Sequence, residues 1–155
     1  MNDRHTSPDL MALALAEAEK AYALGEVPVG AVIYHVPTDK IIATAHNLVE
    51  QNHDATAHAE MLVIRQAYKM LGTKSLADCD LWVSLEPCAM CAGAIAHSRI
   101  RRLYYGAEDA KGGAVDNGPH LFHQPTIHHR PEVYGGLSAS QSRTLLKSFF
   151  AKMRT

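Results

Sequence analysis

Apolar residues recur along the chain in two patterns, one with helical spacing and one in short continuous runs. Helical spacing predicts helices over residues 9–24, 57–71 and about 87–97, and a C-terminal helix that carries Leu145, Leu146, Phe149, Phe150 and Met153. Short apolar runs predict strands over residues 29–34, 40–46, 81–85 and 100–105, with a short edge strand at 132–134. Residues 106–131 are rich in Gly, Pro, His and Asn, and we expect a long loop there, with one helical turn near Leu121 and Phe122.

The order of these elements predicts the fold class. The first two strands flank a turn at Pro37-Thr38-Asp39 and are expected to form a hairpin. The later strands are separated by helices, a pattern that favours parallel pairing with helices on both faces of the sheet. We therefore expect an α/β fold, a three-layer α/β/α sandwich around a mixed five-stranded sheet. The length of 155 residues suits a single domain, residues 1–155.

Composition and charge indicate the general class of the protein, its cellular location and a candidate binding surface. The chain is 47% hydrophobic and 20% charged, which is ordinary for a soluble globular protein. It has no apolar run of membrane-spanning length and no signal-like start, so we expect a cytoplasmic protein without a membrane partner. Residues 1–98 hold six Lys/Arg and twelve Asp/Glu, whereas residues 99–155 hold nine and four, so the balance changes from −6 to +5. This asymmetry allows a basic face in the last third, although an uneven solvated surface would give the same numbers.

Two short segments carry candidate chemistry, His58-Ala59-Glu60 and Pro87-Cys88-Ala89-Met90-Cys91. Cysteines three residues apart share one face of a helix, and the start of a helix favours thiolates. His58 also stands at a predicted helix start, so the two helices can bring His58, Cys88 and Cys91 to one metal. Three protein ligands with an open fourth position characterise catalytic zinc. Glu60 is then expected to move protons beside the metal, and H-x-E…P-C-x-x-C is a known signature of zinc nucleobase deaminases.

Other interpretations of the Cys-x-x-Cys pair exist. Alone, it fits a structural zinc site or a redox pair about as well. A structural site would need a fourth ligand, for which His97, His120, His123, His128 and His129 are candidates, although loop histidines are more often solvated. A redox pair has no use for His-x-Glu. We expect the remaining cysteine, Cys79, to be a buried inert thiol.

Longer segments resemble a known family. These are PVGAVI (28–33), TAHAEMLVIR (56–65), SLEPCAMCAGAIAHSRIRR (84–102), YGAEDAKGGA (105–114) and SFFAKMR (148–154). They resemble the bacterial tRNA-specific adenosine deaminases, a branch of the cytidine-deaminase-like superfamily, and the resemblance covers nearly the whole chain. It implies a cytidine-deaminase-like fold, one Zn²⁺ per subunit and a homodimer. It also implies that the wobble adenosine in the anticodon stem-loop of an arginine tRNA is converted to inosine.

The same resemblance assigns roles around the substrate. It implies that Asn47 hydrogen-bonds the nucleoside, that Val29 packs against the base and that the backbone N–H of Ala59 meets the purine ring. The backbone carbonyl beside Glu86 would receive the leaving amine.

The resemblance also implies an RNA-binding surface, in which Asp109 and Lys111 contact the tRNA near the wobble nucleotide. Residues 115–131 depart from the general family pattern, so the roles of the histidines there stay open. Two other functions remain to be weighed: a deaminase of free guanine, cytosine or nucleosides with the same fold, and a non-catalytic zinc-stabilised binding module. A small-molecule enzyme tends to close its pocket with its C-terminal segment, and has no need of the basic residues Arg143, Lys147, Lys152 and Arg154 on one helix.

Overall fold

The structure, a computed structural model, describes residues 9–154 and has the α/β architecture that the sequence predicts. The helices are α1 (Leu10–Ala23), α2 (Val49–Asn52), α3 (Ala59–Leu71), α4 (Ala89–Ser98) and α5 (Ala139–Met153), with a single 3₁₀ turn, η2 (Leu121–His123), in the long loop. The strands are β1 (Gly30–His35), β2 (Lys40–His46), β3 (Cys79–Leu85), β4 (Arg102–Ala107) and β5 (Glu132–Tyr134).

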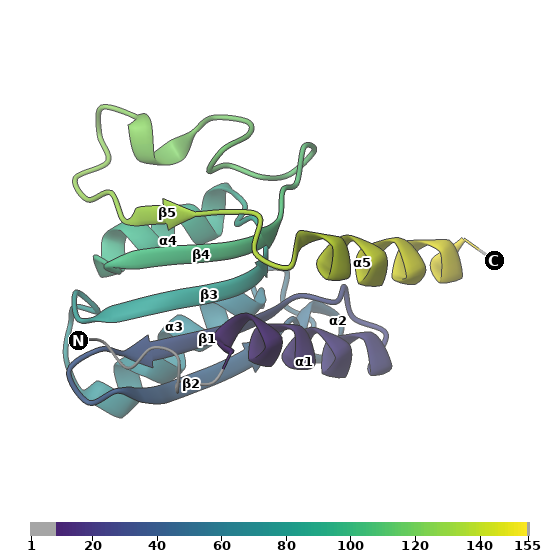
Figure 1. The fold of residues 1–155 in the computed structure, drawn as a ribbon, viewed down its shortest axis with the longest axis horizontal. Helices are drawn as coiled ribbons and strands as arrows, with labels where there is room; N and C mark the ends of the chain where they lie inside the picture. The colour runs from purple at the N-terminus through teal and green to yellow at the C-terminus, as the bar shows by residue number, and fades with distance from the viewer. Residues whose placement is uncertain (1–8, 155) are drawn as a thin grey trace.

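The five strands form one mixed sheet with the order β2-β1-β3-β4-β5. β1 pairs antiparallel with both β2 and β3, whereas the β3–β4 and β4–β5 pairs are parallel. Figure 1 shows α1 and α5 on one face of this sheet and α3 and α4 on the other, which gives three layers. The predicted fold class, a three-layer α/β/α sandwich around a mixed five-stranded sheet, is therefore confirmed.

The bounds of the elements differ from the predicted ones by small shifts. β2 and β5 begin and end where the pattern places them, whereas β3 begins two residues earlier than predicted, at the buried Cys79. The first three predicted helices begin one or two residues late, and each is preceded by an N-cap residue with an extended backbone, Asp9, His58 or Cys88; only Asp9 makes a side-chain capping hydrogen bond. The short helix α2 was not predicted, since four residues are too few for a helical pattern to show.

The helices pack closely on the sheet, and one glycine makes this possible on the α1 face. A β-carbon at Gly30, the first residue of β1, would lie 2.0 Å from the backbone oxygen of Ala14 and 2.5 Å from the backbone nitrogen of Ala18. Both atoms belong to α1, so this helix contacts the strand backbone directly. The larger hydrophobic core lies on the opposite face, beneath α3 and α4.

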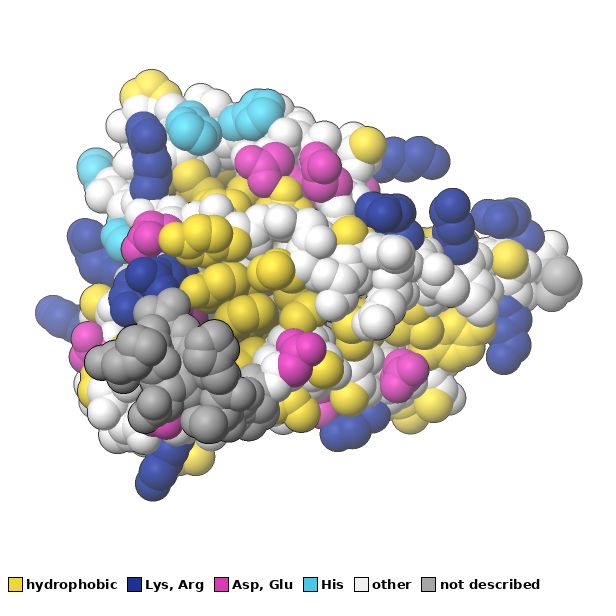
Figure 2. Space-filling view, viewed as in Figure 1, with side chains coloured by type: hydrophobic (Ala, Val, Ile, Leu, Met, Phe, Trp, Pro, Cys, Tyr) yellow, Lys and Arg dark blue, Asp and Glu magenta, His cyan; other side chains and the backbone are white. Residues whose placement is uncertain are grey.

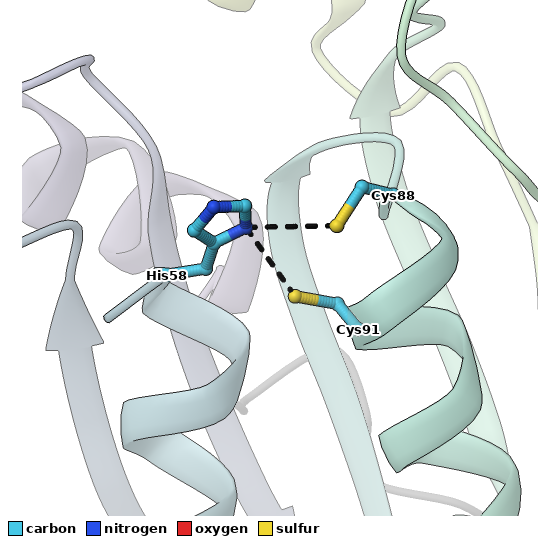
Figure 3. Close-up of side chains that lie close together, drawn as sticks. All are labelled: His58, Cys88 and Cys91. Atoms are coloured by element: carbon cyan, nitrogen blue, oxygen red, sulfur yellow. Dashed lines mark hydrogen bonds between the residues drawn. The ribbon is translucent and has the colours of Figure 1, made fainter. Parts of the chain in front are cut away.

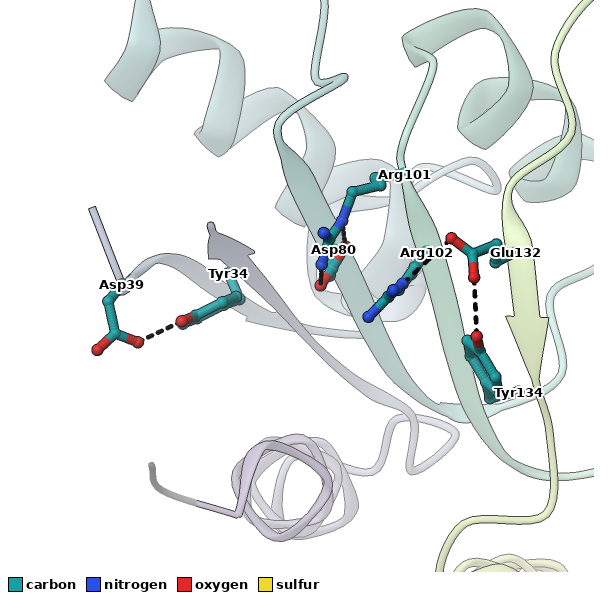
Figure 4. Close-up of polar contacts among 7 residues, drawn as sticks. All are labelled: Tyr34, Asp39, Asp80, Arg101, Arg102, Glu132 and Tyr134. Carbon is teal, nitrogen blue, oxygen red and sulfur yellow. Dashed lines mark hydrogen bonds and ion pairs between the residues drawn. The ribbon is translucent and has the colours of Figure 1, made fainter. Parts of the chain in front are cut away.

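Two arginines at the amino ends of β3–β5 are paired with carboxylates. At the amino ends of β3–β5, Arg101 donates two hydrogen bonds to Asp80, of 2.9 and 2.7 Å, and Arg102 pairs with Glu132 at 3.2 Å (Figure 4). These arginines are therefore held far along the strands from the carboxyl end of β3, where α4 begins. Arg101 and Arg102 therefore do not contribute to the basic face predicted for residues 99–155, because each pairs with a carboxylate at the amino ends of the strands.

None of the helices within residues 9–154 combines the length and the hydropathy that crossing a bilayer requires.

Candidate active site

The three predicted metal ligands meet where two helices begin side by side. His58 is the N-cap of α3 and Cys88 is the N-cap of α4, and both have extended backbone conformations. Neither side chain makes a capping hydrogen bond, so both can point into the space between the helices (Figure 3). Nδ1 of His58 lies 3.6 Å from Sγ of Cys88 and 3.6 Å from Sγ of Cys91.

These distances fit a zinc ion. With bonds of about 2.1 Å to nitrogen and 2.3 Å to sulfur, tetrahedral geometry separates the two donor atoms by about 3.6 Å. The three donor atoms all lie within 4.8 Å of one another, and all cysteines in the described chain are free thiols. No fourth His, Cys, Asp or Glu within residues 9–154 joins this group. The donor set therefore fits a site with three protein ligands and one open position, which is the catalytic pattern.

Electrostatics around the site suit both metal binding and proton transfer. The neighbouring Cys91 thiol, together with the His58 ring, lowers the pKa of Cys88 to about 4, so this sulfur is a thiolate at neutral pH. Glu60 belongs to the first turn of α3 and is 4% exposed. Burial raises the pKa of Glu60 to about 7, and a carboxyl group with such a pKa can both accept and return a proton near neutrality.

A pocket of about 700 Å³ opens onto these residues. Of the predicted ligands, His58 and Cys88 line it, whereas Cys91 is fully buried behind them. Glu60 also lines the pocket. The remaining predicted site residues in its wall are Val29, Asn47, Ala59, Glu86 and Asp109. The structure thus brings together nearly all of the predicted site.

Asn47 lies in the pocket wall and has an unused hydrogen-bond acceptor. Its side chain is 6% exposed, and within the described residues its Oδ1 has no hydrogen-bond partner. Its backbone N–H donates to the carbonyl of Val29 at 3.1 Å, so both residues are held in the same wall. Ala59 is the first residue of α3, where the backbone N–H has no partner within the helix. The pocket wall therefore contains a residue with one unused acceptor and the N–H group at the start of a helix.

Lys111 is the one predicted site residue outside this arrangement. It is exposed and does not line the pocket, but its backbone N–H donates to Oδ1 of Asp109 at 3.1 Å. The two residues therefore belong to one turn at the edge of the pocket. Glu86 contributes more than a backbone carbonyl, since its buried carboxylate accepts hydrogen bonds from this loop. Burial would raise the pKa of Glu86, but these N–H donors hold it below its ordinary value.

The sequence patterns did not reveal two further parts of the pocket. Glu26 is 1% exposed, and its carboxylate accepts hydrogen bonds from the backbone N–H groups of Glu50 (3.0 Å) and Gln51 (2.7 Å), which fixes α2 beside the pocket. An isolated acidic residue gives no sequence signal for such a role.

The second unexpected part is the wall formed by α5. Phe149, Phe150 and Met153 line the pocket, although their helical spacing indicated only an amphipathic helix. An edge-to-face contact between Phe149 and Tyr22, with centroids 5.8 Å apart, holds α5 against α1. Phe150 and Met153 remain 44% and 64% exposed, so they border the pocket without sealing it.

Positively charged side chains lie along the same helix, α5. Lys and Arg side chains gather along the part of the surface that α5 occupies (Figure 2), and those of Arg143, Lys147, Lys152 and Arg154 are exposed. Lys152 also lies over the ring of Tyr22, 5.4 Å from its centroid. The basic face predicted for the last third of the chain is therefore present on α5.

The structure also tests the expectation for Cys79 and the alternative of a structural zinc site with four protein ligands. Cys79 is fully buried, and burial raises its pKa to about 11, as expected for an inert thiol. None of the loop histidines in the described chain belongs to a metal-binding group, and His129 instead contacts the carbonyl of Ile100 at 2.7 Å. A structural four-ligand site is therefore disfavoured.

The fold and the three-ligand site are those of a class of zinc enzymes, and comparison with known proteins shows which one. The family described as the cytidine and deoxycytidylate deaminase zinc-binding region matches residues 4–107, so the chain contains a zinc-binding deaminase domain. A tRNA-specific adenosine deaminase of Agrobacterium fabrum is 52% identical over 144 residues, which are 93% of each chain. The chain belongs to the family of the tRNA-specific adenosine deaminases.

Solved structures agree with this placement. A structure from work on tRNA:A34 deaminases, which edit A to I at the wobble position of transfer RNA, has a TM-score of 0.85 at 52% identity and covers 88% of this chain and 98% of that one. A guanine deaminase of Bacillus subtilis is also similar, with a TM-score of 0.62 at 31% identity, over 100% of this chain and 96% of that one. A guanine deaminase therefore has a similar fold, so the fold alone does not define the substrate.

Proposed function

We propose that this protein converts the wobble adenosine in the anticodon loop of a tRNA, an arginine tRNA, to inosine by hydrolytic deamination. The observation that carries the choice of substrate is the partly exposed wall formed by α5. Phe150 and Met153 leave the pocket open toward a surface that carries four cationic side chains. An enzyme for a free base would gain from a sealed pocket, whereas a flipped-out nucleotide must stay connected to its RNA.

In this proposal His58, Cys88 and Cys91 hold one Zn²⁺. The ion supplies the Lewis acidity that makes water a nucleophile at neutral pH. The chain's own residues then hold the base and move the protons.

Glu60 is the proposed proton carrier. Its carboxylate takes a proton from the attacking water and passes it to the purine ring nitrogen. It then takes the proton of the hydroxyl now bonded to C6 and delivers it to the departing amine, so that the C6–N bond breaks and the C6 carbonyl forms. The overall change is adenosine plus water to inosine plus ammonia. Its burial in the pocket wall and its pKa of about 7 suit both steps.

The base is held by residues of the pocket wall, among them Asn47 and the first residue of α3. We assign Oδ1 of Asn47 as an acceptor for the nucleoside and the backbone N–H of Ala59 as a donor to the purine ring. Val29 packs against the base, and the carbonyl beside Glu86 accepts from the departing amine. Asp109 and Lys111, at the pocket edge, contact the neighbouring nucleotides.

The proposal also includes two properties of the whole molecule, a homodimer and a cytoplasmic location, where tRNA is the available substrate. The family resemblance supports the homodimer, and the proposed tRNA substrate supports the location. Sedimentation of the purified chain tests the first, since a mass of one chain at micromolar concentration would refute a stable dimer.

The deciding experiment is an assay for inosine on an arginine-tRNA anticodon stem-loop with adenosine at the wobble position. Free adenosine, guanine and cytidine serve as parallel substrates. We expect inosine in the RNA only. Turnover of guanine or another free base, with none in the RNA, would overturn the tRNA assignment and favour a small-molecule deaminase.

A further inference from the structure

The Glu86 carboxylate lies at the centre of a hydrogen-bond arrangement that the deamination chemistry does not require. The residue is 2% exposed, yet both of its oxygens are fully used. Oε1 accepts from the backbone N–H of Asp109 at 3.0 Å and from Nδ2 of Asn117 at 2.6 Å. Oε2 accepts from three consecutive backbone N–H groups, those of Val115 (3.0 Å), Asp116 (2.9 Å) and Asn117 (3.1 Å).

All five donors belong to residues 108–117, which we call the Glu86 loop. This segment has no helix or strand, so its backbone N–H groups need acceptors elsewhere when they are buried. Successive N–H groups converging on one oxygen form an anion-binding concavity, here filled by a carboxylate of the same chain. A β-carbon at Gly113 would lie 2.5 Å from Cδ of Glu86. The loop backbone therefore packs directly against the carboxylate, and a glycine permits the approach.

The carboxylate also connects this loop to the metal site. Glu86 follows the last residue of β3 and stands two residues before Cys88. Two backbone hydrogen bonds of 2.9 Å join the same parts, from Glu86 N–H to the carbonyl of Ala107 and from Ala114 N–H to the carbonyl of Pro87. The strand that leads to the metal ligand and the loop at the pocket edge are thus one hydrogen-bonded unit.

The end of the loop nearest the pocket carries the proposed RNA contacts. Asp109 lines the pocket, and its Oδ1 accepts from the backbone N–H groups of Lys111 (3.1 Å) and Gly112 (3.0 Å). Glu86 fixes the backbone of Asp109, and Asp109 in turn fixes the turn that carries Lys111. A change at the Glu86 side chain would therefore reach both residues through the backbone of the loop.

We infer that the Glu86 side chain is a positioning residue for RNA binding, which holds Asp109 and Lys111 at the edge of the pocket through the Glu86 loop. This inference rests on the proposed function and deepens it. The side chain acts on how tightly the anticodon loop is bound rather than on the reaction of the base, since Glu60, His58 and Cys88 are held by α3 and α4.

Glu86→Gln tests the inference with little change in shape. In either orientation the amide NH₂ group faces N–H donors, where a carboxylate oxygen now accepts two or three hydrogen bonds. We expect KM for the anticodon stem-loop to rise by about tenfold or more, because small displacements of positioning groups weaken binding strongly, while kcat changes by less than about threefold. Zinc content and the unfolding temperature verify that the site is intact. Glu17→Gln is the matched control, because Glu17 is also buried but pairs with His46 and Lys20 on the α1 side.

A double-variant cycle distinguishes positioning from general destabilisation. Lys111→Ala should raise KM in the parent chain and have little further effect in Glu86→Gln, because the contact is already lost. Independent, multiplicative effects on KM would overturn the inference, as would an unchanged KM in a folded, zinc-loaded Glu86→Gln protein. A parent chain that forms no inosine would refute the proposed function, and this inference with it.

Asn117→Ala covers the case in which Glu86→Gln does not fold. It removes the 2.6 Å bond from Nδ2 to Glu86, together with a 3.1 Å bond from the same Nδ2 to Glu108, and leaves the four backbone donors to Glu86 in place. We expect KM to rise by about threefold with kcat unchanged. A folded Asn117→Ala protein with the parental KM would overturn the inference.

Discussion

Replacing Glu60 by glutamine separates the proton carrier from the metal ligands. The substitution keeps the size and shape of the side chain but removes its ability to accept or release a proton. Glu60 is 4% exposed in the pocket wall, so bulk water has little access to the place of the carboxylate. We therefore expect the deamination rate to fall while the fold and the bound zinc persist.

The size of the loss follows from the role assigned to this residue. A positioned acid–base group contributes about 10²- to 10⁴-fold to a rate, which corresponds to about 3 to 5.5 kcal/mol of activation free energy. The effect on folding should be small, because burial already raises the pKa of Glu60 to about 7 and so disfavours its charged form. A neutral amide of the same size therefore removes little that stabilises the folded state.

The assay is single-turnover inosine formation on the anticodon stem-loop, with zinc measured per chain and unfolding followed by circular dichroism. Glu19→Gln, on the exposed side of α1, is the matched control. A rate within about tenfold of the parent would refute the role of Glu60 as proton carrier. Loss of zinc in Glu60→Gln would instead show that this residue is a ligand, contrary to the three-ligand site.

Three further substitutions test other parts of the molecule. Cys88→Ala should lose zinc and unfold at a lower temperature, because metal binding is coupled to folding, and retention of one zinc per chain would contradict the ligand assignment. Gly30→Ala should lower the unfolding temperature by about 5 °C or more, since the new methyl group would lie 2.0 Å from the backbone oxygen of Ala14, and an unchanged melting curve would show that α1 can move away at no cost. Charge reversal at Lys111 and Lys147 should weaken turnover of the tRNA stem-loop, and flatten its salt dependence, more than it affects any turnover of free adenosine, whereas equal effects would exclude these residues from the RNA surface.

Local patterns in the sequence were enough to predict the helices and strands and the candidate metal ligands. Helical and strand periodicities are local properties, so the hairpin, β2 and β5 could be located from the pattern of apolar residues alone. The ligand set was also readable, because a cysteine pair at i and i+3 and a histidine at a second helix start encode their own geometry. The 3.6 Å distances from His58 to both cysteines agree with the arrangement that these local patterns predict.

The tertiary structure alone decided what surrounds those ligands. Phe149 and Phe150 follow a pattern typical of any amphipathic helix, and only the packing of α5 on α1 places them in the pocket wall. Arg101 and Arg102 counted toward a basic face until pairing with distant carboxylates placed them at the other end of the sheet. Glu86 is an acidic residue beside a motif in the sequence, and becomes the anchor of a loop more than twenty residues away only after β3 and β4 pair. The physical reason is the same in each case: periodicity and spacing record interactions within one element, whereas walls, charge partners and buried acceptors depend on which distant segments the sheet brings together.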